Sequence, residues 1–161
     1  MSHPQQPGRR RALALLGAAP LLVAGCGFKL RGARQMPFES IHLGMSPYLE
    51  LTAAIRRQLR ANGDTVITDK AEDAQVRLEV LADRKEKVIL ALNTQGKVRE
   101  YQLRHRFIFR LVDVKTGQEA LPNNEIFLYR DLAFDDTQLL AKEQEEILLY
   151  RDMLNDLVQQ L

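Results

Sequence analysis

The feature that most limits how this chain can fold is a stretch of alternating apolar and polar residues at positions 98–114. Strict alternation is the pattern of a β-strand with one face in the core and the other in solvent. One face of the predicted strand carries Tyr101, Leu103, Phe107, Phe109 and Leu111, and the other carries Gln102, Arg104, Arg106 and Arg110. At ~3.3 Å per residue, an unbroken strand of this length exceeds about 50 Å, so we expect a bend or bulge within it.

Ahead of this strand, a segment with helical periodicity begins at Ser46 and Pro47. Serine can cap a helix and proline suits its first position, so these two residues predict a helix start. Asn62 and Gly63 supply the stop. One face of this predicted helix holds Tyr48, Leu51, Ile55 and Leu59.

A second helix is predicted at the end of the sequence, with Asp135 or Asp136 as its cap. Its apolar residues recur every seven positions, as Leu140, Ile147, Leu154 and Leu161. We expect this stripe to pack on the sheet.

The remaining periodic segments are short strands. They are predicted at residues 38–43, 76–80, 88–92 and 125–134, with a charged break at 83–87, a hairpin turn at 93–96 and a loop at 121–124. The order of strand, helix, strands and helix predicts a single α+β domain with two helices packed on one face of a mostly antiparallel sheet.

The first 25 residues have the features of an export signal. Three consecutive arginines, Arg9 to Arg11, precede an apolar run at 12–24 that Gly17 and Pro20 interrupt. This run is too short and too broken to span a membrane, which needs about 20 apolar residues. Removal of residues 1–25 takes away three arginines and no acid, which leaves a net charge of −1. The basic balance therefore gives no argument for a nucleic-acid partner.

The end of this signal, Leu22 to Cys26, resembles the lipobox of bacterial lipoproteins. The resemblance implies cleavage before Cys26, a covalent lipid on its sulfur and a mature domain of residues 26–161. Gly27, in place of aspartate, favours the outer membrane. The alternative is that Cys26, the only cysteine in the chain, stays a free thiol, although such a thiol is a liability in an oxidising compartment. Residues 27–32 alternate around Phe28 and Leu30 and predict a short strand or an extended tether after the lipid.

Residues typical of enzyme chemistry are missing from the sequence. It has no metal-ligand cluster, no glycine-rich phosphate loop and no nucleophile elbow. His105 shares the alternation face of Phe107, so we interpret it as a core or rim histidine. We expect neither catalysis nor any cofactor beyond the lipid on Cys26.

Basic residues line the long strand. They are Lys97, Arg99, Arg104, Arg106 and Arg110, with Arg130 as a possible neighbour on the last strand. One interpretation is an ordinary solvated sheet face with cross-strand partners such as Glu79. The other is a surface for a polyanion, because the guanidinium group binds phosphate and carboxylate at two points.

Four segments together resemble the LPS-assembly lipoprotein family LptE, also called RlpB. They are the mature start at 25–31, the helix end at 55–63, the strand start at 100–103, and Arg130, Phe134, Asp135 and 140–142 near the last helix. The resemblance covers essentially all of the mature chain. It implies two helices on a roughly four-stranded sheet.

The resemblance also implies a role and partners. LptE forms a one-to-one complex with LptD as a plug inside its β-barrel at the outer membrane, facing the periplasm. There it supports barrel assembly and receives lipopolysaccharide. Members bind lipopolysaccharide through basic residues, and of those only Lys142 lies in a run that matches residue by residue. Lys97 and the strand arginines are candidates by charge alone. The alternative is a non-catalytic, periplasm-facing scaffold lipoprotein without lipopolysaccharide binding.

Overall fold

The computed structural model describes residues 36–63 and 65–161. The export signal, Cys26 and the predicted tether lie outside these residues. The strands are β1 (Ser40–Leu43), β2 (Val66–Thr68), β3 (Val76–Leu92), β4 (Val98–Asp113) and β5 (Glu119–Ala133). The helices are α2 (Glu50–Asn62) and α3 (Leu139–Gln160), with single 3₁₀ turns at η2 (Ala71–Asp73) and η3 (Asp136–Gln138).

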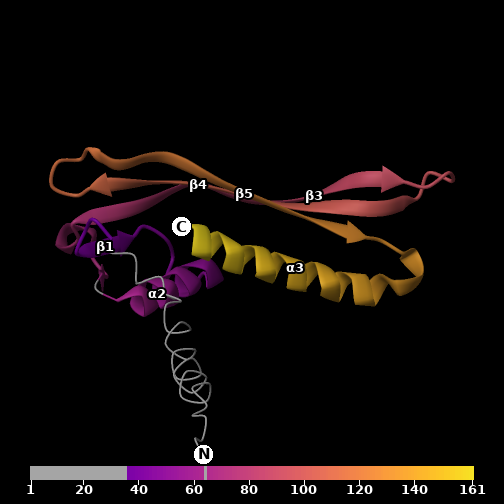
Figure 1. Ribbon diagram of the computed structural model, residues 1–161, viewed down its shortest axis with the longest axis horizontal. Helices are drawn as coiled ribbons and strands as arrows, with labels where there is room; N and C mark the ends of the chain where they lie inside the picture. Colours follow the sequence, from indigo (N-terminus) through magenta and orange to yellow (C-terminus); the bar gives the residue numbers. More distant parts are fainter. Residues whose placement is uncertain (1–35, 64) are drawn as a thin grey trace, which may run out of the picture. The chain divides into compact units, whose positions relative to one another are not determined.

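The strands form one sheet in the order β2-β1-β3-β4-β5 (Figure 1). β3, β4 and β5 are antiparallel neighbours, whereas β1 runs parallel to both β2 and β3. The prediction of an α+β fold is confirmed, but that of a mostly antiparallel, four-stranded sheet is wrong in detail. The sheet is mixed and five-stranded because α2 carries the chain back across the sheet, and such a crossover makes β1 and β2 parallel.

The close pairing of β1 and β3 depends on Gly44. Its backbone N–H donates to the Leu78 carbonyl at 3.0 Å. A Cβ atom at this position would lie 2.6 Å from the same oxygen, so no side chain fits without moving the strands apart.

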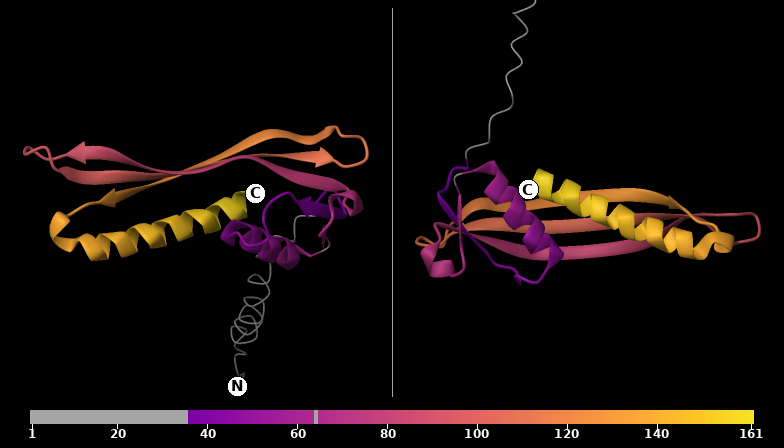
Figure 2. Two further views of the ribbon diagram at one scale, coloured as in Figure 1. Left: turned by 180° about the vertical axis from the view of Figure 1, so that it is seen from behind. Right: turned by 90° about the horizontal axis from the view of Figure 1, so that it is seen from below.

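Both helices lie on the same face of the sheet (Figures 1 and 2). A single core cluster joins them to the strands. Its most deeply buried members include Ile55 of α2, Leu103 and Phe107 of β4, and Leu157 of α3. The predicted inner face of the long strand is therefore confirmed.

The charged segment 83–87 is not a break, contrary to the prediction. β3 continues through it, paired with β4 from Val76 to Leu92, with register shifts between Val80 and Ala82, between Ile89 and Ala91 and between Ala91 and Leu92. Since β1 pairs only with the segment 76–78, the rest of β3 has a free edge. Charged residues on a free edge discourage pairing with other chains, which accounts for their presence in a strand.

β5 also begins earlier than predicted, because residues 121–124 belong to the strand rather than to a loop. Pro122 fits there since β5 is an edge strand, where a residue can lack the N–H donor. The expected irregularity in β4 is confirmed: its register with β5 shifts on both sides of Leu111.

The first predicted helix starts later than expected. α2 begins at Glu50, and Ser46 instead anchors the turn before it. The Thr52 hydroxyl donates to the Ser46 carbonyl at 2.7 Å. Tyr48, assigned to the apolar face, lies in this turn and is 95% exposed. Gly63 ends α2 with a positive φ of 113°, as predicted.

Only the second half of α3 is packed as the seven-residue stripe predicted. Leu154 and Leu157 are buried, but Leu140 is 78% and Ile147 is 53% exposed. A straight helix drifts by ~20° per heptad, so a strict repeat of seven does not stay on one face. No helix in the described ranges is long and apolar enough to cross a membrane.

Candidate functional site

The predicted basic residues divide into three groups in the structure. Arg104, Arg106 and Arg110 lie on the sheet face opposite the helices, which we call the open face. Lys97, Arg99 and Lys142 lie near the β3–β4 hairpin and the start of α3, and we call them the hairpin-end cations. Arg130 faces the helices instead.

On the open face, Arg106 and Arg110 are engaged by carboxylates. Arg106 donates to both oxygens of Glu125, at 2.6 and 3.1 Å. Arg110 donates to Glu79 at 2.8 Å and to Glu119 at 2.9 Å. Glu79, the partner named from the sequence, is therefore a partner of Arg110, and Glu119 and Glu125 are further partners on this face.

These pairs shift the proton affinities of their members. The hydrogen bond from Arg110, followed by that from Arg77, lowers the pKa of Glu79. The hydrogen bond from Arg106 lowers the pKa of Glu125. Both carboxylates therefore stay charged at neutral pH, and much of the positive charge on this part of the face is compensated.

Arg104 differs from its neighbours because its partner is neutral. Its Nε donates to Gln102 at 2.8 Å, and it makes no salt bridge to a described residue. Directly across from it in the sheet lie Glu86 on β3 and Tyr129 on β5. Tyr129 and its neighbour Phe127 are 55% and 50% exposed, with ring centroids 6.5 Å apart.

Arg130 does not join the strand arginines. It pairs with Leu103 across β4 and β5, on the face that carries the helices, and it forms a salt bridge with Asp156 of α3. The interpretation of Arg130 as a neighbour of the basic stripe is wrong, because its position in β5 gives it the opposite parity.

The hairpin-end cations gather around the segment that connects β5 to α3. Lys97 Nζ lies 2.7 Å from Asp136 Oδ2, and this hydrogen bond raises the pKa of Lys97. Lys142 pairs with Glu145 at 2.8 Å, and its charge contributes to the lowered pKa of Asp135, for which the hydrogen bonds from Thr137 are the main cause. Lys97, which lies 45 positions before Lys142 in the sequence, thus pairs with an aspartate just ahead of the helix that carries Lys142.

Arg99 completes this group. It lines an open hollow of about 660 Å³ together with Lys97, Tyr101, Phe134 and Asp136. The Phe134 N–H donates to the Arg99 carbonyl at 2.8 Å, which joins the end of β5 to the start of β4. The side chain of Arg99 makes no salt bridge to any residue that the structure describes.

The sequence did not single out Lys87, which lies beside the same hollow. Its Nζ is 4.4 Å from the ring centroid of Tyr101 and 2.6 Å from Glu146 on α3. Alternation continued from Val80 would have placed Lys87 on the outer face. The register shift between Val80 and Ala82 reverses the parity, so that Lys87 pairs with the inward-facing Leu103.

The expected core position of His105 is confirmed. Its side chain is 1% exposed and its Nε2 lies 2.7 Å from Asp83 Oδ1. Within the described part of the chain, no three His, Cys, Asp or Glu residues are grouped to hold a metal ion.

Comparisons with known proteins first define the class. The solution structure of uncharacterized lipoprotein B from Nitrosomonas europaea has a TM-score of 0.71 and 36% identity, over 83% of this chain and 86% of that one. The fold is thus that of a small α+β lipoprotein domain.

The family follows from sequence. The family model "LptE: Lipopolysaccharide-assembly" matches residues 38–161. LPS-assembly lipoprotein LptE of Yersinia enterocolitica is 32% identical, over 94% of this chain and 73% of the relative. That of Photorhabdus laumondii is 34% identical, over 90% and 80%. The chain belongs to the LptE family of lipoproteins, which takes part in lipopolysaccharide assembly. The resemblance inferred from four segments is confirmed.

Proposed function

We propose that this protein binds lipopolysaccharide through the hairpin-end cations while it plugs the LptD β-barrel and supports its assembly. The observation that carries the proposal is the pairing of Lys97 with Asp136, which lies just ahead of α3, the helix that carries Lys142 in its first turn. Lys142 lies in the run 140–142 that resembles the family sequence. Lys97 and Arg99 are the other two hairpin-end cations. In this proposal residues 1–25 are removed and Cys26 carries the lipid that holds the domain at the outer membrane.

The chemistry of this end suits an anionic lipid. Two of the three cations, Lys97 and Arg99, line a hollow whose wall also includes Tyr101 and Phe134, with ring centroids 5.1 Å apart. Lipopolysaccharide carries phosphates and carboxylates beside acyl chains. Its anionic groups can replace Asp136 as the partner of Lys97, since exchange between exposed ion pairs costs little free energy.

Exposed apolar side chains on both faces support a partner that surrounds the domain. Phe127 and Tyr129 stand on the open face, and Leu140, Ile147 and Leu148 stand on α3. Large apolar side chains that gather on a surface mark sites of interaction with a partner. A barrel wall would cover both faces at once, whereas a partner on one side would leave the other exposed.

The decisive variant is Lys97→Asp with Lys142→Asp. Both side chains lie at the surface or at its edge, so we expect the melting temperature to change little. Lipopolysaccharide affinity should fall at least tenfold, because two attractive contacts become repulsive. Titration with purified lipopolysaccharide measures the change.

The matched control is Lys70→Asp with Lys115→Asp, which makes the same charge change at exposed positions remote from the hairpin. Its affinity should stay within about twofold of the unaltered protein. Equal losses in both double variants would attribute binding to net charge, and an unchanged affinity in the first would refute the assignment.

The plug is tested by purification of the tagged lipoprotein from outer membranes in mild detergent. We expect a large β-barrel protein at equal stoichiometry, identified by mass spectrometry. Recovery of the lipoprotein alone, or with soluble periplasmic partners, would contradict the plug.

A second candidate is a scaffold lipoprotein without lipopolysaccharide binding. The carboxylate partners of Arg106 and Arg110 favour it, because compensated arginines have little charge left for a polyanion. Salt separates the two functions: binding by exposed cations should weaken markedly between 0.05 and 0.5 M salt, roughly as the Debye length shortens. No saturable binding at low salt would favour the scaffold.

A further inference from the structure

Two lysines lie beside the aromatic pair at the hairpin end. Tyr101 and Phe134 line the hollow that also includes Lys97. Lys87 is outside that lining, with its Nζ 4.4 Å from the ring centroid of Tyr101 and 6.0 Å from that of Phe134. One aromatic wall thus has two ammonium groups as neighbours, one from β3 and one from the hairpin turn.

Each of these lysines is paired with a carboxylate at or near the start of α3. Lys97 Nζ lies 2.7 Å from Asp136 Oδ2, and Lys87 Nζ lies 2.6 Å from Glu146 Oε2. Oxygens of a phosphate group bind ammonium at similar distances. The two carboxylates therefore mark two positions at which anionic groups of a ligand fit.

Lys87 can change its partner with little rearrangement. Its side chain is 34% exposed and that of Glu146 is 24% exposed, so solvent reaches the pair. The face of the Tyr101 ring attracts the ammonium group whichever anion is its partner. An anionic group can therefore replace Glu146 while Lys87 stays in place, which keeps the cost of ordering the side chain low.

The Lys87–Glu146 pair is not the main attachment of α3 to the sheet. The second half of the helix is anchored by buried side chains, among them Met153 and Leu157. The hydroxyl of Tyr150 also donates to a backbone carbonyl of β3 at 2.9 Å. A partly exposed ion pair adds little to such burial, so its exchange leaves the helix in place.

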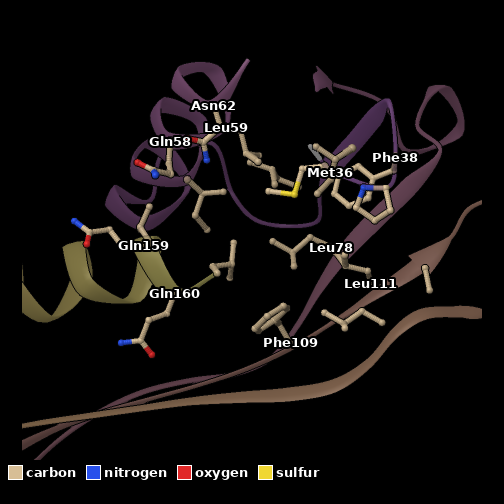
Figure 3. A pocket seen from close by; sticks show the side chains of 18 residues that line it. Met36, Phe38, Gln58, Leu59, Asn62, Leu78, Phe109, Leu111, Gln159 and Gln160 are labelled. Carbon is tan, nitrogen blue, oxygen red and sulfur yellow. The ribbon is translucent and has the colours of Figure 1, made fainter. Parts of the chain in front are cut away.

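The enclosed cavity at the other end of α3 offers anions no comparable partner. Figure 3 shows this cavity of about 330 Å³, which α2, the C-terminal end of α3 and the strands enclose. Its lining is apolar apart from the side-chain amides of Gln58, Asn62, Gln159 and Gln160. No lysine, arginine or histidine is among the described residues that line it. Anionic groups are therefore expected at the hairpin end.

We propose that Lys87 is a further lipopolysaccharide-binding residue, and that the hairpin end accepts a lipid with two separate anionic groups. One group replaces Asp136 at Lys97, and the other replaces Glu146 at Lys87. The inference rests on the proposed function, because it adds a second anion position to the same site. A lipid with two phosphates should therefore bind more tightly than the same lipid with one.

The test titrates the full chain, purified in detergent, with the diphosphorylated and monophosphorylated forms of lipid A, the acylated part of lipopolysaccharide. Lys87→Gln and Lys97→Gln should each lower the affinity for the diphosphorylated form about five- to tenfold, since each removes one charge-assisted contact. For the monophosphorylated form, at most one of the two variants should lose more than about twofold. An unchanged affinity of Lys87→Gln for the diphosphorylated form, or larger losses of both variants with one phosphate, would overturn the proposal.

Glu146→Gln separates binding from a structural role of the ion pair. It removes the same pair but leaves the charge of Lys87 free, so its affinity should stay the same or rise. Equal losses in Lys87→Gln and Glu146→Gln would assign the pair to structure and overturn the proposal. Lys85→Gln is the matched charge control: this lysine, on the same strand, lies 5.5 Å from the Tyr150 ring, and its loss should change affinity less than about twofold.

Failure of the proposed function gives a different result. If Lys97→Asp with Lys142→Asp lowers the affinity and Lys87→Gln does not, only the role of Lys87 is overturned. If the unaltered protein shows no saturable binding of either lipid, both proposals are overturned.

Discussion

At the scale of single residues, Glu79 is the carboxylate on the open face that accepts hydrogen bonds from two arginines. It accepts hydrogen bonds from Arg77 and Arg110, which come from different strands, and its side chain is 23% exposed. These two hydrogen bonds lower its pKa below the ordinary value near 4.5. The folded state therefore binds the carboxylate form more strongly than the unfolded state does.

This difference predicts how stability depends on pH. A depressed folded-state pKa contributes stability that is complete above the unfolded pKa and is lost as pH falls below about 4.5 through the folded pKa. Glu79→Gln should lower the melting temperature by about 2–4 °C at pH 7 and by less at pH 3. Thermal unfolding across this range measures it. Glu72→Gln, at an exposed residue of η2, is the control and should show neither effect.

At the scale of elements, alternation assigns the two faces of the sheet to different environments. Phe107 of β4 is 0% exposed, whereas Phe127 of β5 is 50% exposed. The two residues are close in the sheet, because Phe107 pairs with Ile126 and Phe127 pairs with Arg106. Phe107 contacts the core beneath the helices, while Phe127 stands on the open face.

The two phenylalanines form a matched pair for mutation. Phe107→Ala should cost about 3–5 kcal/mol of unfolding free energy, through lost burial and a cavity. Phe127→Ala should cost less than about 1 kcal/mol in the isolated protein. Denaturant titration compares them, and similar losses would mean that the open face is covered in the isolated protein.

The free edges are a further property of elements. β3 beyond residue 78 and all of β5 lack an outer neighbour, although both strands are long. β3 carries charges and bulges along its free edge, and β5 carries Pro122 in its first half. These features discourage edge-to-edge association.

At the scale of the whole domain, the two halves of α3 contribute differently to stability. The second half of the helix packs on the core, whereas Leu140 and Ile147 in the first half are exposed. Those side chains add nothing to the core of the isolated domain. Their burial against a partner would account for their apolar character.

Leu140→Lys with Ile147→Lys tests this division. The isolated variant should keep its melting temperature within about 2 °C, because neither side chain is in the core. If the domain plugs a β-barrel as we propose, recovery of that barrel in purification should fall severalfold. Glu143→Lys on the same half of α3 is the control for added charge, and a wild-type yield in the double variant would exclude this surface from the interface.

The sequence determined the features that depend on local pattern. A period of two defined the inner face of β4, helical periodicity located α2 and α3, and four short segments identified the family. Asn93 to Gly96 also defined a tight turn, because Gly96 adopts a φ of 76° that favours glycine. Each of these patterns can be recognised from residues that are close together in the sequence.

Only the tertiary structure decided which distant residues meet. It joined segments 83–87 and 88–92 into one strand, paired the three-residue β2 with β1, and gave Arg130 to α3 rather than to the basic stripe. It also paired Lys97 with Asp136, just ahead of α3. The physical reason is that periodicity defines the faces of an element, whereas its neighbours depend on register and chain crossing, which come from the packing of the whole domain.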